Sequence, residues 1–218
     1  MTTSSPLTRS CLPKDFSESS DFLKNFIIAT KNKGKLNEFS RILEPLDINC
    51  ITADIPDVEE NGKSFEENAY IKAYHAYKAT GLPSIGDDSG LEVDALNGHP
   101  GIFSARYSGI NSTDSANIEK LLKNMDGITD RSARFVCAIC CVLSETEKII
   151  VRETCEGDIS KNPLGENGFG YDSVFICQTG KTFAQESDNL KDEISHRGKA
   201  LRELYEKLSE REKLNDNK

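Results

Sequence analysis

The sequence lacks several features that would assign it to a class at once. It has no apolar run near the roughly 20 residues that cross a bilayer, and residues 1–24 contain no apolar signal-peptide core. Positive charge is also scarce, because 27 Lys and Arg face 36 Asp and Glu, for a net charge of −9. We therefore expect a cytoplasmic protein with no membrane segment and no general nucleic-acid-binding surface.

A P-loop is also missing. The Gly-Lys-Ser at 62–64 and the Gly-Lys-Thr at 180–182 have Asp57 and Phe175 where the motif GxxxxGK[ST] requires its first glycine. The seven cysteines are an odd number and lie mostly in apolar stretches, as reduced core cysteines do. Cys137 and Cys140 are three residues apart in a predicted strand, so we expect them on opposite faces rather than in one redox or zinc site.

The length of 218 residues and the apolar fraction of 37% suit one domain with one core. We expect a disordered leader at 1–24, the domain at 25–209 and a frayed tail at 210–218. The chain opens with a strand, a loop, a helix and a strand, which indicates an α/β fold. In order, the pattern predicts a strand at 25–30, a helix around 36–43, a strand at 48–52, a helix at 65–78 capped by Ser64, a strand at 82–90 that breaks at Asp87-Asp88, a strand at 91–96, a helix at 114–125, two antiparallel strands joined near 144–147, a strand at 173–177 and a final helix capped by Ser195.

The polar loop "TKNKGK" lies between the first strand and the first helix. A loop in this place offers free backbone N–H groups and the positive end of a helix dipole to an anion. Thr30, Asn32 and Lys35 are its candidate ligands. The alternative is a solvated basic turn.

Acidic residues gather at two places, Glu59 and Glu60 in a loop and Asp87 and Asp88 at a predicted strand end. Adjacent carboxylates repel each other, and a divalent cation relieves that repulsion. Carboxylates from two separate loops are typical of Mg²⁺, which also keeps waters and substrate phosphates as ligands. The alternative is an Asp turn in which Asp88 caps its own backbone.

Two later segments carry further polar candidates. In the glycine-rich stretch 162–172, Phe169 and Tyr171 could stack on a base and Asp172 could bind its edge, unless the aromatic rings pack into the core. Lys191, His196 and Arg197 flank the start of the last helix, where cations indicate an anionic or polar ligand, although His196 could also be a surface histidine. Together the four clusters favour a nucleoside polyphosphate processed with Mg²⁺.

Five motifs in this order resemble the inosine triphosphate pyrophosphatase family, over about residues 25–209. They are "T-x-N-x-x-K" after the first strand, "F-x-E-N-A-x-x-K-A" at 65–73, "DDSGLEVDAL-x-G-x-PG-x-x-SARY-x-G" at 87–109, "GFGYD" at 168–172 and "SHRGKAL" at 195–201. The resemblance implies an α/β fold with a long, twisted mixed sheet, flanking helices and two lobes around a central nucleotide-binding cleft. It also implies a homodimer that hydrolyses ITP, dITP or XTP to the monophosphate and pyrophosphate with Mg²⁺, or with Mn²⁺ in its place.

The resemblance implies residue roles as well. Asp88 would be the base and a metal ligand, and Glu60 the second metal ligand, although the assignment could shift to Glu59. The nucleotide-binding residues would be Thr30, Lys31, Asn32, Lys33, Gly34, Lys35, Ser89, Phe169, Gly170, Tyr171, Asp172, Lys191, His196 and Arg197. Asn167 and Ser173 depart from the family pattern beside "GFGYD", which affects the stiffness of the loop rather than the chemistry.

A donor such as Arg197 or His196 would favour a 6-oxo purine over adenine, because adenine presents a donor there. Nothing in the sequence accounts for the rejection of GTP, which shares the 6-oxo group. Three alternatives remain open at this point. They are a nucleotide phosphatase that releases single phosphates, a non-catalytic nucleotide sensor, and a redox or zinc protein built on Cys137 and Cys140.

Overall fold

The computed structural model describes residues 25–216, so the predicted leader at 1–24 lies outside the described part of the chain. Its strands are β1 (Asn25–Ile28), β2 (Asn49–Ile51), β3 (Ser84–Val93), β4 (Ser132–Val142), β5 (Lys148–Ile159) and β6 (Phe175–Ile176). They form one sheet in the order β2-β1-β3-β4-β5-β6. β1 is parallel to both of its neighbours, β2 and β3. From β3 to β6, each strand is antiparallel to the next. The predicted α/β class with a mixed sheet is confirmed.

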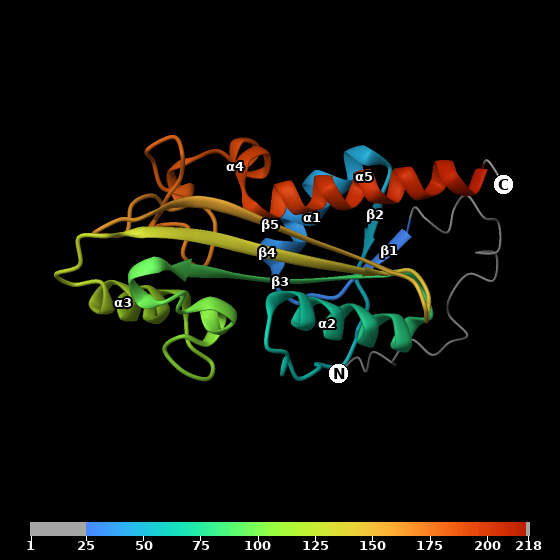
Figure 1. Cartoon of the computed structure of the whole chain (residues 1–218), viewed down its shortest axis with the longest axis horizontal. Coiled ribbons are helices and arrows are strands. Elements are labelled where there is room, and N and C mark those ends of the chain that lie inside the picture. The colour runs from blue at the N-terminus through green and yellow to red at the C-terminus, as the bar shows by residue number, and fades with distance from the viewer. Residues whose placement is uncertain (1–24, 217–218) are drawn as a thin grey trace, which may run out of the picture.

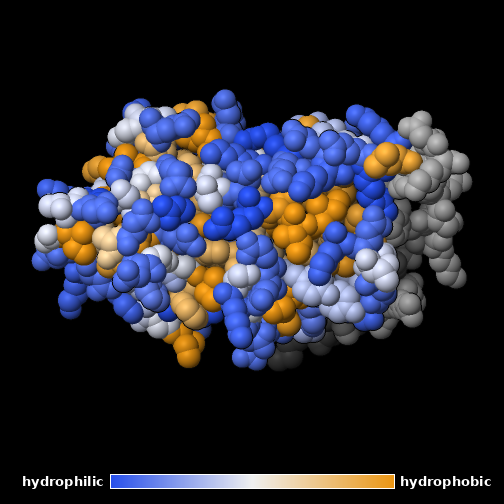
Figure 2. All heavy atoms as spheres, in the orientation of Figure 1, coloured by the Kyte–Doolittle hydropathy of each residue, from blue (hydrophilic) through white to orange (hydrophobic). Residues whose placement is uncertain are grey.

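Helices cover both faces of this sheet (Figure 1). The helices are α1 (Lys33–Leu43), α2 (Phe65–Thr80), α3 (Asp114–Asn124), α4 (Asp188–Ile194) and α5 (His196–Asp216), with short 3₁₀ turns η2 (Glu44–Leu46), η3 (Asp94–Leu96), η4 (Gly101–Arg106) and η5 (Phe183–Gln185). α1 and α5 pack on one face and α2 on the other. Figure 2 shows a mostly hydrophilic surface with a hydrophobic area between α5 and α2, over the long strands. Within residues 25–216, no helix has both the length and the apolar character that spanning a bilayer requires.

β3 is one continuous strand, so the predicted break at Asp87-Asp88 and the separate strand at 91–96 are wrong. Asp87 pairs with Ile139 and Asp88 with Ala138 in an unbroken antiparallel register with β4. Successive side chains of a strand point to opposite faces, and this separates the two carboxylates without a turn. The strand ends at Val93, after which the chain forms η3.

The cysteines behave as core residues. Cys137 packs in the cluster with α1 and α5, whereas Cys140 packs against α2 on the opposite face of the sheet, as the three-residue spacing predicts. All cysteines in the described part of the chain are free. No group of three or more His, Cys, Asp or Glu side chains among the described residues could hold a metal ion. The redox or zinc alternative therefore has no structural support.

The predicted caps are present. Ser64 Oγ accepts from the Glu67 N–H at 3.2 Å, and the Glu67 carboxylate accepts from the N–H of Lys63. Ser195 Oγ accepts from the Gly198 N–H at 3.1 Å at the start of α5. The pattern did not predict α4, which ends directly before Ser195, and α5 continues past residue 209 to Asp216.

Candidate active site

A cavity of about 390 Å³ opens beside β3, between the loop that precedes α1 and the segment that contains Phe169. This volume lies in the range of small-molecule sites. Most of the predicted site residues line it, namely Thr30, Lys31, Asn32, Lys35, Glu60, Asp88, Ser89, Phe169, Gly170, Tyr171, Asp172, Lys191, His196 and Arg197. The fold therefore brings together the four polar clusters of the sequence.

Four of the residues named from the sequence do not line the cavity, namely Lys33, Gly34, Glu59 and Asp87. Lys33 and Glu59 are exposed side chains outside it, which leaves Glu60 as the acidic loop residue that faces the cavity. Gly34 lies so close to Phe169 that a Cβ atom there would be 2.5 Å from the Phe169 ring. A glycine at this position therefore allows Phe169 to pack against α1.

The loop after β1 presents the N-terminus of α1 to the cavity. Asn32 caps the helix, with its Oδ1 accepting from the Lys35 N–H at 3.1 Å. Thr30 Oγ1 accepts from the Asn32 N–H at 3.2 Å, which holds the loop in a tight turn. Lys31 lies at the surface and pairs with Asp57 at 2.7 Å. The loop can therefore offer backbone N–H groups and the Lys35 ammonium to an anion.

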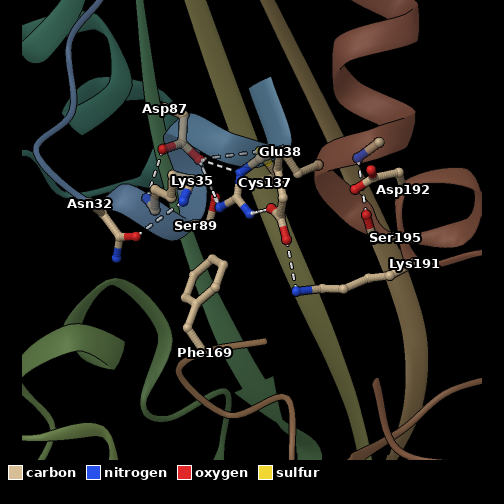
Figure 3. A network of polar contacts seen from close by, with 12 residues as sticks. Asn32, Lys35, Glu38, Asp87, Ser89, Cys137, Phe169, Lys191, Asp192 and Ser195 are labelled. Atoms are coloured by element: carbon tan, nitrogen blue, oxygen red, sulfur yellow. Dashed lines mark hydrogen bonds and ion pairs between the residues drawn. The ribbon is translucent and has the colours of Figure 1, made fainter. Parts of the chain in front are cut away.

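Asp87 points toward α1 and α5 and is almost completely buried. The Lys35 ammonium lies 2.7 Å from Asp87, and the Arg197 guanidinium and the Ser89 hydroxyl both donate to Asp87 Oδ2 (Figure 3). Burial alone would raise the pKa of Asp87, but Lys35 and Arg197 outweigh it and hold the pKa well below its usual value. Asp87 is thus a fixed anion that anchors cationic side chains.

Glu38 extends the same network and was not identified from the sequence. This buried carboxylate of α1 accepts from Arg197 and lies 2.7 Å from the Lys191 Nζ (Figure 3). The Lys191 Nζ also lies 2.6 Å from Asp172. Burial raises the pKa of Asp172, and the Lys191 ammonium offsets this only in part. Charges of opposite sign therefore alternate through the buried wall of the cavity.

Asp88 points to the α2 side and has different neighbours. Its Oδ2 accepts from the Asn68 amide at 3.0 Å, and its Oδ1 lies 3.6 Å from the Lys72 Nζ. Lys72 also lies 3.0 Å from a Glu60 oxygen, so the ammonium bridges the two carboxylates. Burial raises the pKa of Asp88, and Lys72 and Lys35 offset this only partly. Asn68 and Lys72 belong to the motif at 65–73, which was the one signal in the sequence that could have indicated them.

His196 is a buried histidine rather than a surface one. Its ring stacks on Phe135 with 4.7 Å between the ring centroids, and its Nδ1 has no hydrogen-bond partner. Burial and the nearby Arg197 and Lys191 hold the pKa of His196 well below its usual value, so the ring is neutral at pH 7. An unpartnered buried polar atom beside the cavity is suited to a ligand.

The two aromatic residues of "GFGYD" have different roles. Tyr171 is buried in the core and its hydroxyl donates to the Ser104 carbonyl at 2.9 Å, so the interpretation of this ring as a base-stacking surface is not supported. Phe169 is half-buried, with the Lys191 Nζ 4.8 Å from its ring centroid. The Gly170 N–H donates to Asp114 at 2.7 Å, a contact that nothing in the sequence indicated. Phe169 is therefore the aromatic side chain of this segment that remains available to a ligand.

The sequence of this chain is similar to those of known proteins. The sequence model of the Ham1 family matches residues 26–207. A dITP/XTP pyrophosphatase of Bacillus licheniformis is 48% identical over 190 residues, which cover 84% of this chain and 96% of the relative. One of Syntrophobacter fumaroxidans is 46% identical over 189 residues, covering 84% of this chain and 82% of the relative.

Solved structures of Ham1 proteins are also similar to the fold of this chain. A HAM1 protein from Coxiella burnetii superposes with a TM-score of 0.79 at 43% identity, over 85% of this chain and 98% of that one. The Ham1 protein of Staphylococcus aureus gives 0.77 at 46% identity, over 86% and 100% of the two chains. The similarity therefore extends over nearly all of the described fold.

Proposed function

The chain belongs to the Ham1 family, and on that premise we propose that it is a dITP/XTP pyrophosphatase. It hydrolyses ITP, dITP and XTP to the nucleoside monophosphate and pyrophosphate, and so removes non-canonical purine nucleotides from the nucleotide pool. One observation carries the assignment of the site. Asp88 and Glu60 converge on Lys72 in the same cavity that the N-terminal end of α1, which is suited to phosphate, also lines.

The charges in the cavity favour a substrate that brings its own divalent cation. Lys31, Lys35, Lys72, Lys191 and Arg197 each already pair with a carboxylate. Arg106 also lines the cavity, where its guanidinium lies over the Phe103 ring. A triphosphate would therefore enter a cavity in which most of the positive charge is already paired, in a protein of net charge −9. Binding as a complex with a divalent metal resolves this, and Ham1-family pyrophosphatases are generally metal-dependent.

Glu60 and Asp88 are the residues that would hold Mg²⁺, or Mn²⁺ in its place. The fit rests on the bridge that the Lys72 ammonium makes between them, because two carboxylates close enough to share one cation supply the hard oxygen ligands that Mg²⁺ prefers. Bound there with the triphosphate, the metal would supply charge neutralisation and acidify water. Lys72 would then be free to bind a phosphate oxygen.

Asp88 is the proposed base for the hydrolytic step. Water attacks at the α-phosphorus, its proton passes to Asp88, and the bond from the α-phosphorus to the bridging oxygen breaks so that pyrophosphate leaves. Its burial and raised pKa make Asp88 a better proton acceptor than Asp87, which is fixed as an anion.

The rest of the cavity binds the nucleotide. The residues from Thr30 to Lys35 hold the phosphates, with Ser89 nearby, and Lys33 contributes only long-range charge because it lies outside the cavity. The base lies against Phe169, within reach of Asp172 and His196. Support comes from the half-buried Phe169 ring and from the unpartnered His196 Nδ1.

Arg197 supplies the preference for a 6-oxo purine. It makes four side-chain hydrogen bonds, to Asp87, Glu38 and Ser89, and one guanidinium N–H remains for a ligand. A guanidinium can only donate hydrogen bonds, so it binds the 6-oxygen of hypoxanthine and repels the 6-amino group of adenine. Replacing Arg197 with Gln, whose amide oxygen can accept from the amino group of adenine, should lower the ratio of kcat/KM for ITP over ATP. An unchanged ratio would remove Arg197 from the selectivity.

We also propose that the protein is a cytoplasmic homodimer, on the strength of its family. Light scattering of the purified protein tests the assembly, and a monomeric mass contradicts it.

The deciding experiment is product analysis with ITP, XTP, dITP, GTP and ATP, with and without Mg²⁺. Pyrophosphate and monophosphate from ITP, dITP and XTP, dependent on Mg²⁺ and weak with GTP and ATP, are expected. Orthophosphate and diphosphate would instead make the protein a phosphatase. Tight binding of ITP without any product would make it a nucleotide sensor.

A further inference from the structure

Asn68 is a completely buried residue of α2. It lies in the motif "F-x-E-N-A-x-x-K-A", whose Asn has no role in the site described so far. Its amide forms one hydrogen bond at each end. Nδ2 donates to Asp88 Oδ2 at 3.0 Å, and Oδ1 accepts from the Gly62 N–H at 2.9 Å. One side chain thus joins β3 to the loop that precedes α2.

The partners of Asn68 determine which way its amide points. The Gly62 N–H can only donate and the Asp88 carboxylate, when ionised, can only accept, so the two ends of the amide cannot exchange. Asp88 Oδ2 is therefore held by Asn68, which leaves Oδ1 toward Lys72 at 3.6 Å.

The loop end of this connection is equally constrained. Gly62 follows Glu60 by two residues, and a Cβ atom at Gly62 would lie 2.7 Å from Asn68 Oδ1 and 2.8 Å from the Glu67 Cβ. The loop therefore lies directly on α2 with no space for a side chain. The helix itself is fixed at this end by the Ser64 cap. Any displacement of the Asn68 amide would move the Glu60-bearing loop and the Asp88 carboxylate relative to each other.

We propose that Asn68 is a positioning residue that sets the relative placement of Asp88 and the Glu60-bearing loop, so that both carboxylates face a divalent cation in a preformed arrangement. The proposal rests on the roles given above to Asp88 and Glu60. It assigns to Asn68 no contact with substrate. Groups that orient metal ligands from behind typically contribute 10- to 100-fold to metal affinity or activity.

The test uses Asn68→Leu, which keeps the approximate size of the side chain and removes both hydrogen bonds. Three quantities are measured, namely kcat and KM for ITP, the Kd of Mn²⁺ without nucleotide by electron paramagnetic resonance, and hydrogen exchange of the Gly62 amide by NMR. We expect kcat to fall about 10- to 100-fold with KM unchanged, and the Kd of Mn²⁺ to rise by a similar factor. Exchange of the Gly62 amide should accelerate.

Asn117→Leu is the matched control. Asn117 is also buried, and its amide also bonds at both ends, to the Ala105 carbonyl and the Ser108 N–H, but it does not touch Asp88. It should lower thermal stability while leaving the Kd of Mn²⁺ and Gly62 exchange at wild-type values. If both variants change these two quantities equally, the effect is general loosening and the proposal is wrong.

Gly62→Ala keeps the test decisive if Asn68→Leu does not fold. It leaves Asn68 and Asp88 chemically intact, and the added methyl group pushes the loop away from the amide, so the Kd of Mn²⁺ should rise. A wild-type Kd in Asn68→Leu, or in Gly62→Ala where the first variant cannot be studied, overturns the proposal. Failure of the proposed function can be told apart from failure of this proposal. The first appears as an absence of pyrophosphate when wild-type protein is given substrate, whereas the second is measured by Mn²⁺ binding and Gly62 exchange, which need no turnover.

Discussion

At the scale of single residues, Asp87 and Asp88 are the same residue type and adjacent in the chain, yet their surroundings differ. Strand alternation places them on opposite faces of β3, where Asp87 meets Lys35 and Arg197 and Asp88 meets Asn68 and Lys72. The pKa of Asp87 is held well below its usual value, and the pKa of Asp88 is raised. Such opposite pKa shifts in two neighbouring carboxylates fit the proposed division of roles, with Asp87 as a structural anion and Asp88 as the base.

Asp88→Asn should therefore lose activity and keep the fold. The amide is nearly isosteric with the carboxylate but cannot accept the proton from water, so we expect kcat for ITP to fall about 10²- to 10⁴-fold. Steady-state kinetics gives the effect, and circular dichroism checks the fold. Asp87→Asn is the control, because it should mainly lower stability by leaving Lys35 and Arg197 without their shared anion. Wild-type turnover in Asp88→Asn would show that Asp88 is not the base.

Arg197→Ala should unfold the protein more readily than loss of a surface arginine would. Arg197 is 2% exposed and pairs with the buried Asp87 and Glu38. Its removal breaks two buried pairs and leaves each carboxylate with one lysine, Lys35 beside Asp87 and Lys191 beside Glu38. Breaking a buried pair in this way costs about 3–5 kcal/mol of unfolding free energy. Urea denaturation measures it. Arg211→Ala is the control, since the pair that Arg211 forms with Glu147 is partly exposed and such pairs contribute about 0–1 kcal/mol. Equal losses in the two variants would contradict the assigned role of Arg197.

Hydrophobic periodicity alone was enough to predict most elements. Leu36, Phe39 and Leu43 marked α1, and the apolar run through Cys137 marked β4, because burial imposes those periods directly. The pattern failed where polar residues are buried. At Asp87-Asp88 it predicted a turn, although pairing with β4 and cations from other elements make a continuous strand possible. The short helix α4 was missed because its seven residues include Lys191, which is polar yet buried.

Residues of the candidate site could be predicted only where a short sequence motif contained them. Lys35, Asp88 and His196 lie in such motifs. Glu38 does not, because its partner Arg197 is 159 residues away in the chain and only the fold reveals the contact. Asp114 is a similar case, 56 residues from Gly170.

The contact between α2 and β3 gives a prediction at the scale of elements. Ala69 and Ala73 keep that side of α2 small, and a Cβ atom on Gly86 would lie 2.6 Å from the Ala73 nitrogen. Gly86→Ala should force the helix away from the strand and lower the unfolding free energy by about 1–3 kcal/mol. Urea denaturation tests this against Ala79→Ser, a change on the exposed side of α2 that should stay within about 0.5 kcal/mol. A wild-type midpoint for Gly86→Ala would mean that the elements are not packed this closely.

At the scale of the whole molecule, the buried wall of the cavity joins segments from both ends of the chain. Glu38 comes from α1, Asp87 from β3, and Lys191 and Arg197 from α4 and α5. Their charges balance within the fold, but His196 is buried among them as a neutral ring. Protonating it would place an unpaired cation beside Arg197 and Lys191. The stability of the entire domain is therefore coupled to the protonation of His196.

This coupling predicts the pH dependence of unfolding. The pKa of His196 is well below its ordinary value of 6.5 in the folded state, so below pH 6.5 the unfolded chain binds a proton that the folded chain does not. Stability is then unaffected by His196 above about pH 7 and falls as the pH drops toward the folded pKa, by at most about 1.4 kcal/mol per pH unit. Urea denaturation of wild type and His196→Gln between pH 7.5 and 5.5 measures the difference, because His75 and His99 are present in both proteins. We expect the free energy of unfolding to decline less steeply with falling pH in His196→Gln, by the contribution of one proton. Parallel declines in the two proteins would show that His196 is protonated as readily in the folded protein as in the unfolded chain.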